Sequence, residues 1–177
     1  KYGANGFRLL NNASTFSGAI VSDQGEVRVE TSDAATGLNP YSNVSAFTIK
    51  NGYLNIFAAN SAFAVQNRVD NDIPITLQAG RIRMESATFN ASNAFNWNEV
   101  VGPVTVASGD AYIDFRDSST GTVQRAITLS GLTMSPGTTF RVGGDGDAST
   151  SIGHGTKYRV FNNALESGGN VPFVGGW

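Results

Sequence analysis

The residues of this chain that could do chemistry are few and widely spaced. His154 is the only histidine, so a serine triad would have to use it, and two histidines cannot share a metal ion within the chain. It lies between Gly153 and Gly155, and no serine stands in a nucleophile-elbow sequence. We therefore expect His154 to be a loop or corner residue and not a catalytic base.

Two pairs of carboxylates have a spacing that acid–base chemistry could use. They are Asp114 with Asp117, and Asp70 with Asp72. Paired carboxylates hydrolyse glycosidic bonds in many enzymes, and Asp114 is predicted to point outward from a strand. Acidic side chains are common on outer faces, however, so we predict no catalytic residue and no enzyme.

One glycine-rich stretch is similar to the glycine and aspartate repeats that bind Ca²⁺ in some β-rolls. It runs from Gly143 to Asp147 and contains two carboxylates, those of Asp145 and Asp147. Calcium takes about six or more oxygen ligands, and a single copy offers only these two carboxylates and nearby carbonyls. A flexible turn is the simpler interpretation. Asp145 and Asp147 are thus the only calcium candidates, and we predict no other metal or cofactor.

The composition excludes several classes of protein. The chain has 177 residues, no cysteine and a net charge of -2, which argues against a disulfide scaffold, a thiolate site and a nucleic-acid-binding surface. No apolar run approaches the ~20 residues of a spanning helix. Nothing in Lys1 to Leu10 resembles a signal peptide. Because the chain lacks an initiator Met and stops at Trp177, we expect a module of a longer protein.

One short unit recurs along the chain and must position any such residues. In it, an alternating apolar and polar segment meets a glycine, after which the alternation resumes. The marker glycines lie 27, 28, 29 and 28 residues apart, and they are Gly25, Gly52, Gly80, Gly109 and Gly137. Alternation of Val, Ile, Phe and Thr predicts β-strands on both sides of each glycine. A constant spacing of this size is typical of repeat architectures.

The glycine could close a hairpin or turn a corner. Asn51-Gly52 suits a type I′ hairpin turn. Pro136-Gly137 does not, because proline cannot adopt the positive φ that such a turn needs at its first central residue. It fits a type II turn with positive φ at the glycine, and the residues before the other glycines tolerate that geometry too. We therefore predict corners in a parallel β-helix, or β-solenoid.

The predicted solenoid has five coils of about 28 residues, stacked at roughly 4.8 Å. A sixth, degraded unit would turn at 152–155 and lead into Tyr158 and Val160. Aligning the glycines places Ile82 opposite Ala111. The candidate third sides of the coils are 62–65, 94–97 and 123–127, and 31–42 is predicted to be an outward loop.

The polar residues that follow the corners should face solvent. They are Arg28, Glu30, Asn55, Arg83, Glu85 and Asp114. Mixed charges indicate a solvated face and not a polyanion site. Exposed aromatic side chains could stack on sugars instead, and the candidates are Tyr53, Tyr112, Trp97 and Trp177. Trp97 lies in an alternating apolar segment typical of a core, and Trp177 could begin a further coil.

The first unit carries a family resemblance. Leu10, Thr15, Phe16, Ser17 and Gly18 match the first half of a known motif, and Gly25, Val27 and Val29 match the second. The stretch resembles the autotransporter-associated β-strand repeat. It departs from that motif at Asn12, Ser14 and Ser22, of which Ser22 replaces an inward apolar residue.

The resemblance implies a right-handed parallel β-helix within a large secreted bacterial protein. Such segments act as stalks, adhesins or scaffolds at the cell surface, so we expect residues 1–177 to be one structural segment of an extracellular fibre. Two alternatives stay open. One is binding or cleavage of carbohydrate along an outer face, with surface glycans as partners. The other is a filament, because uncapped coil ends invite pairing with neighbouring repeats or with another copy of the chain.

Overall fold

The described part of the chain forms two parallel β-sheets. A computed structural model describes residues 3–9, 16–31, 43–58, 68–86, 97–117, 125–144 and 158–162. Within these ranges there are twelve strands and no helix, which confirms the predicted all-β class. Each sheet has six strands, and every pairing within a sheet is parallel.

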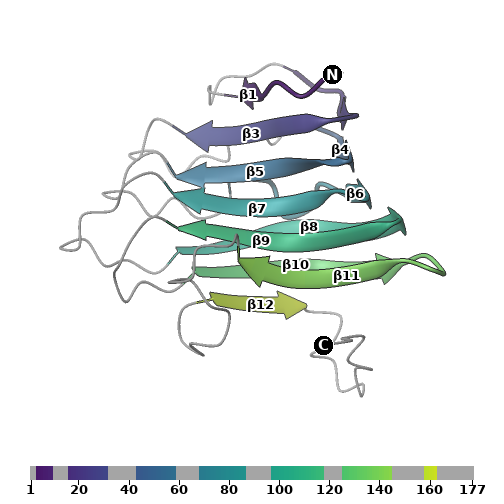
Figure 1. Cartoon of the computed structure of the whole chain (residues 1–177). Coiled ribbons are helices and arrows are strands. Elements are labelled where there is room, and N and C mark those ends of the chain that lie inside the picture. The colour runs from purple at the N-terminus through teal and green to yellow at the C-terminus, as the bar shows by residue number, and fades with distance from the viewer. Residues whose placement is uncertain are drawn as a thin grey trace.

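Odd-numbered strands form one sheet, the odd sheet, and even-numbered strands form the even sheet (Figure 1). The odd sheet contains β1 (Phe7–Leu9), β3 (Gly25–Thr31), β5 (Gly52–Ala58), β7 (Arg81–Ser86), β9 (Asp110–Asp117) and β11 (Thr139–Gly144). The even sheet contains β2 (Ala19–Ser22), β4 (Ala46–Lys50), β6 (Ile75–Gln78), β8 (Trp97–Ser108), β10 (Arg125–Met134) and β12 (Tyr158–Asn162). Since β4 pairs with β2 and β6 in the even sheet, the glycine units are not hairpins.

The apolar side chains of both sheets meet in one core. Val27, Leu54, Ile82 and Ile113 are cross-strand neighbours in the odd sheet, and each is 0% exposed. Phe47, Ile75 and Val104 form a matching row in the even sheet. Each such side chain contributes about 1.5–3 kcal/mol by leaving water. Strand alternation alone therefore explains why these rows face inward.

Ser22, the polar departure from the family motif, is also buried at an inward position. Its hydroxyl donates a hydrogen bond to the carbonyl oxygen of Gln24 at 3.1 Å. A local partner thus satisfies this hydroxyl inside the core.

The turns between the sheets differ from the predicted geometry in two units. At Gly137 φ is 76°, and the Thr138 N–H donates to the Ser135 carbonyl at 3.2 Å, as a type II turn requires. In two other units the positive φ lies one residue earlier, at Asn51 and Ala79. Gly52 is needed there for a different reason, because a Cβ on it would lie 2.3 Å from the Gly25 carbonyl oxygen.

The register between β7 and β9 also differs from the alignment of the glycines. Ile82 pairs with Ile113 and not with Ala111. One cause is a bulge in β8, where Leu77 pairs with Val106 but Gln78 pairs with Ser108. The extra residues in this unit shift the following strand by two positions. A shift of two preserves the inward face, so the core row is kept.

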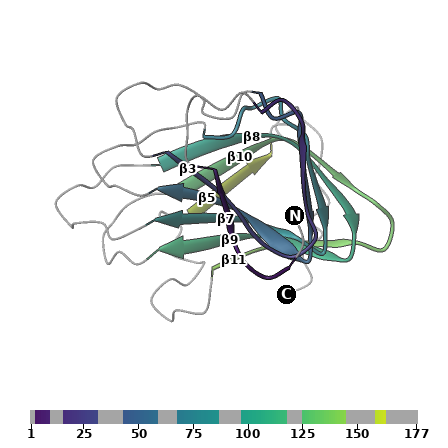
Figure 2. The same ribbon diagram turned by 90° about the horizontal axis from the view of Figure 1, so that it is seen from above.

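The candidate third sides do not form separate strands where they are described. Trp97 begins β8, and residues 125–127 begin β10, so both belong to long strands of the even sheet. Val101 and Val104 are both buried, and this step of three residues breaks the alternation at Gly102. A Cβ on Gly102 would lie 2.1 Å from the Ile73 carbonyl oxygen. The long strands run along two sides of the molecule in the view of Figure 2.

The predicted sixth unit is wrong in its placement. Tyr158 and Val160 were expected after a corner, below Val142 in the odd sheet. They lie in β12, which pairs with the first half of β10 in the even sheet. The proposed corner at 152–155 lies outside the described residues, as do 32–42, 62–65 and 94–96.

Away from its corner end, where Lys50 pairs with Gln78, the outer face of the even sheet carries small, uncharged residues. Cross-strand pairing aligns Val21 with a row of threonines and aligns a second row of small residues beside it. We call this set the neutral face, and its members are Ala19, Val21, Ala46, Thr48, Pro74, Thr76, Pro103, Thr105, Gly131 and Thr133.

Candidate functional site

The outer face of the odd sheet carries the polar and aromatic side chains. Alternation turns them away from the core, and the parallel register aligns them from strand to strand. One row runs Arg8, Arg28, Asn55, Arg83 and Asp114. We call the whole set the polar ladder, and its other members are Glu26, Glu30, Tyr53, Phe57, Arg81, Glu85, Tyr112, Arg116 and Arg141.

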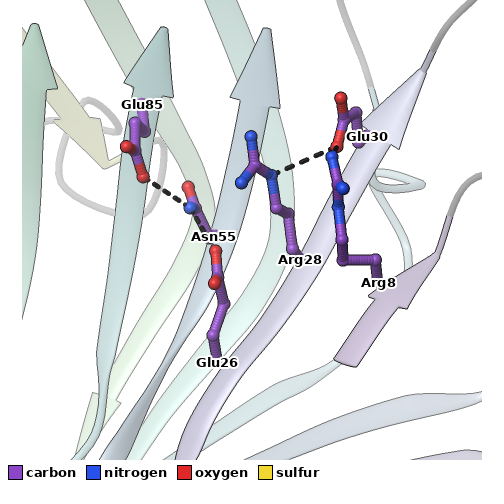
Figure 3. A network of polar contacts seen from close by, with 6 residues as sticks. All are labelled: Arg8, Glu26, Arg28, Glu30, Asn55 and Glu85. Carbon is purple, nitrogen blue, oxygen red and sulfur yellow. Dashed lines mark hydrogen bonds and ion pairs between the residues drawn. The ribbon is translucent and has the colours of Figure 1, made fainter. Parts of the chain in front are cut away.

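Asn55 lies at the centre of the polar ladder. Its Nδ2 donates to Glu26 Oε1 at 2.5 Å and to Glu85 Oε2 at 2.7 Å, one partner on each neighbouring strand (Figure 3). The side chain is fully buried. Its Oδ1 has no hydrogen-bond partner among the described residues. Asn55 therefore links three strands through its amide nitrogen.

Glu30 joins the first two strands of the same face. Its carboxylate accepts from Arg8 Nη2 and lies 3.2 Å from Arg28 Nε (Figure 3). The guanidinium of Arg28 also stacks over the Phe57 ring, 3.2 Å from the ring centroid. Arg28 thus connects a carboxylate on its own strand with an aromatic ring on the next one.

Arg83 and Asp114 form a buried ion pair, with side-chain exposures of 7% and 1%. The Arg83 guanidinium also lies over the Tyr53 ring, 4.4 Å from its centroid. Burial raises the pKa of Tyr53, and the carboxylates of Glu26 and Glu85 raise it further, against the opposing effect of Arg83 and Arg116. The Tyr53 phenol is therefore held neutral.

Toward the far end of the odd sheet, Tyr112 lies between two arginines. Arg81 and Arg141 come from the strands on its two sides, with guanidinium carbons 4.4 and 5.9 Å from the ring centroid. Arg141 also pairs with Asp110. Guanidinium groups thus already occupy the ring faces that a sugar would need for stacking.

The prediction of a solvent-exposed face is wrong for four of its six residues. Glu30, Asn55, Arg83 and Asp114 are buried, at 7% exposure or less. A short side chain on this face is surrounded by longer side chains, which come from its own strand and from the two neighbouring strands. Asn55, for example, has Tyr53 and Phe57 on either side along β5. Neighbouring side chains exclude water from it.

Of the remaining candidate residues, Asp70 and Asp72 lie within the described ranges. Asp70 accepts a hydrogen bond from the Asp72 backbone N–H at 3.2 Å, and its own carbonyl accepts from Ile73 at 3.1 Å. Asp70 thus stabilises a turn before β6. The side chains of Trp97 and Asp117, and the whole of Asp145, Asp147, His154 and Trp177, lie outside the described residues.

A second buried charge, Arg68, is not among the predicted features. Arg68 is 2% exposed, and the Glu99 side chain is fully buried. Burial lowers the pKa of Arg68, and the carboxylate of Glu99 opposes that shift. Glu99 Oε1 also accepts from the Val69 N–H at 3.0 Å. The position of Glu99, two residues before buried Val101, was the only available signal that it points inward.

Neither metal chemistry nor a membrane span is evident in the part of the chain that the structure describes. No group of three or more Asp, Glu or His side chains converges there as metal ligands. No helix in those ranges could cross a membrane. Comparison of the chain with protein-family models, with curated proteins and with solved structures found no match.

Proposed function

We propose that this chain is a structural segment of a right-handed parallel β-solenoid. It would contain five to six coils, stacked so that equivalent residues of successive coils lie opposite one another. The observation that supports this most directly is the continuity of the cross-strand rows. The same inward row passes through every strand of the odd sheet from Phe7 to Val142. A unit repeated in this way builds length and stiffness without a cleft.

The polar ladder supports a structural role as well. Its polar and charged side chains bind one another across strands, as Asn55 does with Glu26 and Glu85 and Arg83 does with Asp114. Pairs of this kind fix the register of neighbouring strands. We propose, following the resemblance to the autotransporter-associated repeat, that the segment belongs to an extracellular bacterial stalk, adhesin or fibre.

Carbohydrate binding or cleavage is the competing function, and the geometry gives it less support. Asp114 is buried and bound to Arg83, so it is poorly placed to donate a proton to a polysaccharide. Tyr112 is flanked by guanidinium groups. A polysaccharide-cleavage screen tests this alternative: turnover by the wild-type chain that is lost in Asp114→Asn would contradict the structural proposal.

The solenoid itself is tested by adding coils. Residues 47–74 span one unit, because Phe47 pairs with Ile75. Three further copies of 47–74, inserted after Pro74, should fold and lengthen the molecule by roughly 14 Å, three strand spacings. X-ray scattering would measure the length. In urea unfolding, the slope of the unfolding free energy against urea concentration should become steeper, because more surface is buried in the folded chain.

The matched control inserts the same residues in scrambled order at the same place. It should add mobile chain without added length or added strand signal in circular dichroism. If the ordered insert behaves like the scrambled one, the solenoid proposal is wrong.

A further inference from the structure

Asparagine is followed directly by glycine at two places in the chain, Asn5-Gly6 and Asn51-Gly52. Both asparagines are exposed to solvent. In such a pair the backbone nitrogen of the glycine can attack the side-chain amide carbon of the asparagine, because glycine has no side chain to hinder the approach. Each pair is therefore a candidate site of spontaneous covalent modification, and the local backbone conformation decides whether the reaction can occur.

The modification passes through a five-membered ring. A bond forms between the glycine nitrogen and the asparagine Cγ, the bond from Cγ to the amide nitrogen breaks, and ammonia leaves with the proton of the glycine N–H. Water then opens the ring at either carbonyl and gives aspartate or isoaspartate. Both products add a negative charge, and isoaspartate also adds one methylene to the backbone, because the chain then runs through its side chain.

Asn51 is held in a conformation that prevents this ring from closing. Its φ is 50°, and a residue with a side chain at such a φ lies in the left-handed region, where ψ is about 30–60°. At that ψ the Gly52 nitrogen points almost directly away from Cβ about the Cα–C bond of Asn51. Ring closure needs the nitrogen and Cβ on the same side of that bond, so the turn must first be rearranged.

The contacts of the turn at Asn51 resist that rearrangement. The Asn51 N–H donates a hydrogen bond to the Gln78 carbonyl oxygen at 3.0 Å. Asn51 lies between β4 and β5, and each of these strands pairs with a neighbour on both sides. A Cβ on Gly52 would overlap the Gly25 carbonyl oxygen, which shows how closely Gly52 packs against the backbone of the preceding unit. Rotation at Asn51 would therefore disturb the pairing of several strands.

The surroundings of Asn5 restrain it less. Asn5 lies in a bend before β1, and its φ is not positive. The atom that a Cβ on Gly6 would approach most closely is Glu26 Oε2, at 3.1 Å. This oxygen is the end of a flexible side chain, whereas the atoms next to Gly52 belong to the backbone. The bend at Asn5 can thus change its conformation without disturbing a strand pairing on both sides.

We propose that Asn5-Gly6 is a site of isoaspartate formation in the folded chain, and that the turn at Asn51-Gly52 blocks the same reaction until the chain unfolds. An isoaspartate at position 51 would lengthen a turn whose glycine already packs against the backbone of Gly25. The modified chain could then not restore the pairing of β4 and β5 with their neighbours. Unfolding that exposes this turn for long enough thus becomes irreversible.

Peptide mapping by mass spectrometry measures both sites in one sample. The chain is kept in mildly alkaline buffer, either folded or unfolded in urea, and samples are digested over time. In the folded chain deamidation should be several times faster at Asn5 than at Asn51, and urea should bring the two rates close together. Similar rates at the two sites in the folded chain would overturn the proposal, and so would a rate at Asn51 that urea leaves unchanged.

The matched variant is Ala79→Asn. Ala79 has a φ of 51° and precedes Gly80, so the substitution places a third asparagine–glycine pair in the same left-handed geometry. This pair should be protected in the folded variant, as Asn51 is, and should react in urea. Rapid deamidation of it in the folded variant would show that a positive φ gives no protection.

Refolding tests the irreversible step. The Asn5→Ala variant is aged in urea, so that of the two pairs only Asn51-Gly52 can react, and the urea is then diluted. Chains with isoaspartate at position 51 should not regain the circular dichroism of the folded chain. Freshly made Asn51→Asp, which adds the same charge without the methylene, should regain it. Refolding of the isoaspartate chains would overturn this step, and failure of Asn51→Asp to refold would assign the effect to the charge and overturn it as well.

Discussion

Arg83 places both Nε and Nη2 at 2.6 Å from the same oxygen of Asp114, Oδ2, across strands β7 and β9. Both side chains are almost fully buried, on a face that the sequence predicts to be solvated. A buried pair costs free energy to desolvate but costs more to break, because removal of one partner leaves an unpaired charge.

We therefore predict that Asp114→Ala lowers the free energy of unfolding by about 3 kcal/mol. Urea denaturation followed by circular dichroism would measure it. The comparison is Asp110→Ala, which removes the partner of exposed Arg141 and should cost less than about 1 kcal/mol. Equal losses in the two variants would show that burial does not decide the strength of these pairs.

Two corner glycines should differ in their tolerance of a side chain. Gly52→Ala would bring a Cβ within 2.3 Å of the Gly25 carbonyl oxygen, so the backbone must move, and we expect a loss of about 3 kcal/mol or more. At Gly137 nothing lies within 4 Å, and only its positive φ is unfavourable for alanine. Gly137→Ala should cost about 1–2 kcal/mol. Thermal unfolding of both variants would rank them, and the reverse order would contradict the geometry.

Ala79→Gly should stabilise the chain. Ala79 has a φ of 51°, and relief of the left-handed strain, set against the greater flexibility of glycine, should yield up to about 1 kcal/mol. The control is Ala46→Gly in strand β4, where the same substitution should lose about 0.5–1 kcal/mol. The two changes in melting temperature are expected to have opposite signs.

Tyr53 should make stability depend on alkaline pH. Its pKa is raised in the folded chain, chiefly by burial, so folding favours the neutral phenol. This contribution is complete below the ordinary tyrosine pKa of about 10 and is lost as pH rises through the higher value in the folded state. Urea unfolding at a series of pH values should show a smaller alkaline loss for Tyr53→Phe than for the wild type. Parallel curves would mean that Tyr53 titrates normally.

The sequence predicted the alternation of the strands and the parallel arrangement well. Ile49 and Leu54, which flank the second corner, are both fully buried, because a period of two assigns a face without knowledge of the neighbours. The units around Gly52 and Gly80 also pair in the expected register, with Leu54 opposite Ile82. Local patterns were sufficient for these features.

The features that escaped prediction depend on neighbouring strands. Burial of Asn55 follows from the lengths of the side chains beside it, which only the final register brings together. The bulge near Ala107 has no sequence signal as clear as a glycine, yet it contributes to the shift that brings Ile82 opposite Ile113. Arg68 lies in a segment without regular alternation, so periodicity could not place it near enough to feel the charge of Glu99.

The sequence pattern also could not predict which residue of each turn adopts a positive φ. The pattern treats the five marker glycines as equivalent, but the positive φ falls on Asn51 in one unit and on Gly137 in another. At Gly52 the tight approach of the Gly25 carbonyl decides which residue is needed. That approach is a property of two stacked turns and not of either turn alone.

The contrast between the polar ladder and the neutral face gives the molecule two sides that should respond differently to ionic strength. Dissolved salt screens the partly exposed charges of Arg8, Arg116 and Arg141, since the screening length falls from about 8 Å at physiological salt to about 3 Å at 1 M. The threonine, alanine and proline side chains of the neutral face carry no charge to screen. Contacts made by that face would instead persist or strengthen in concentrated sulfate, which favours the burial of apolar groups.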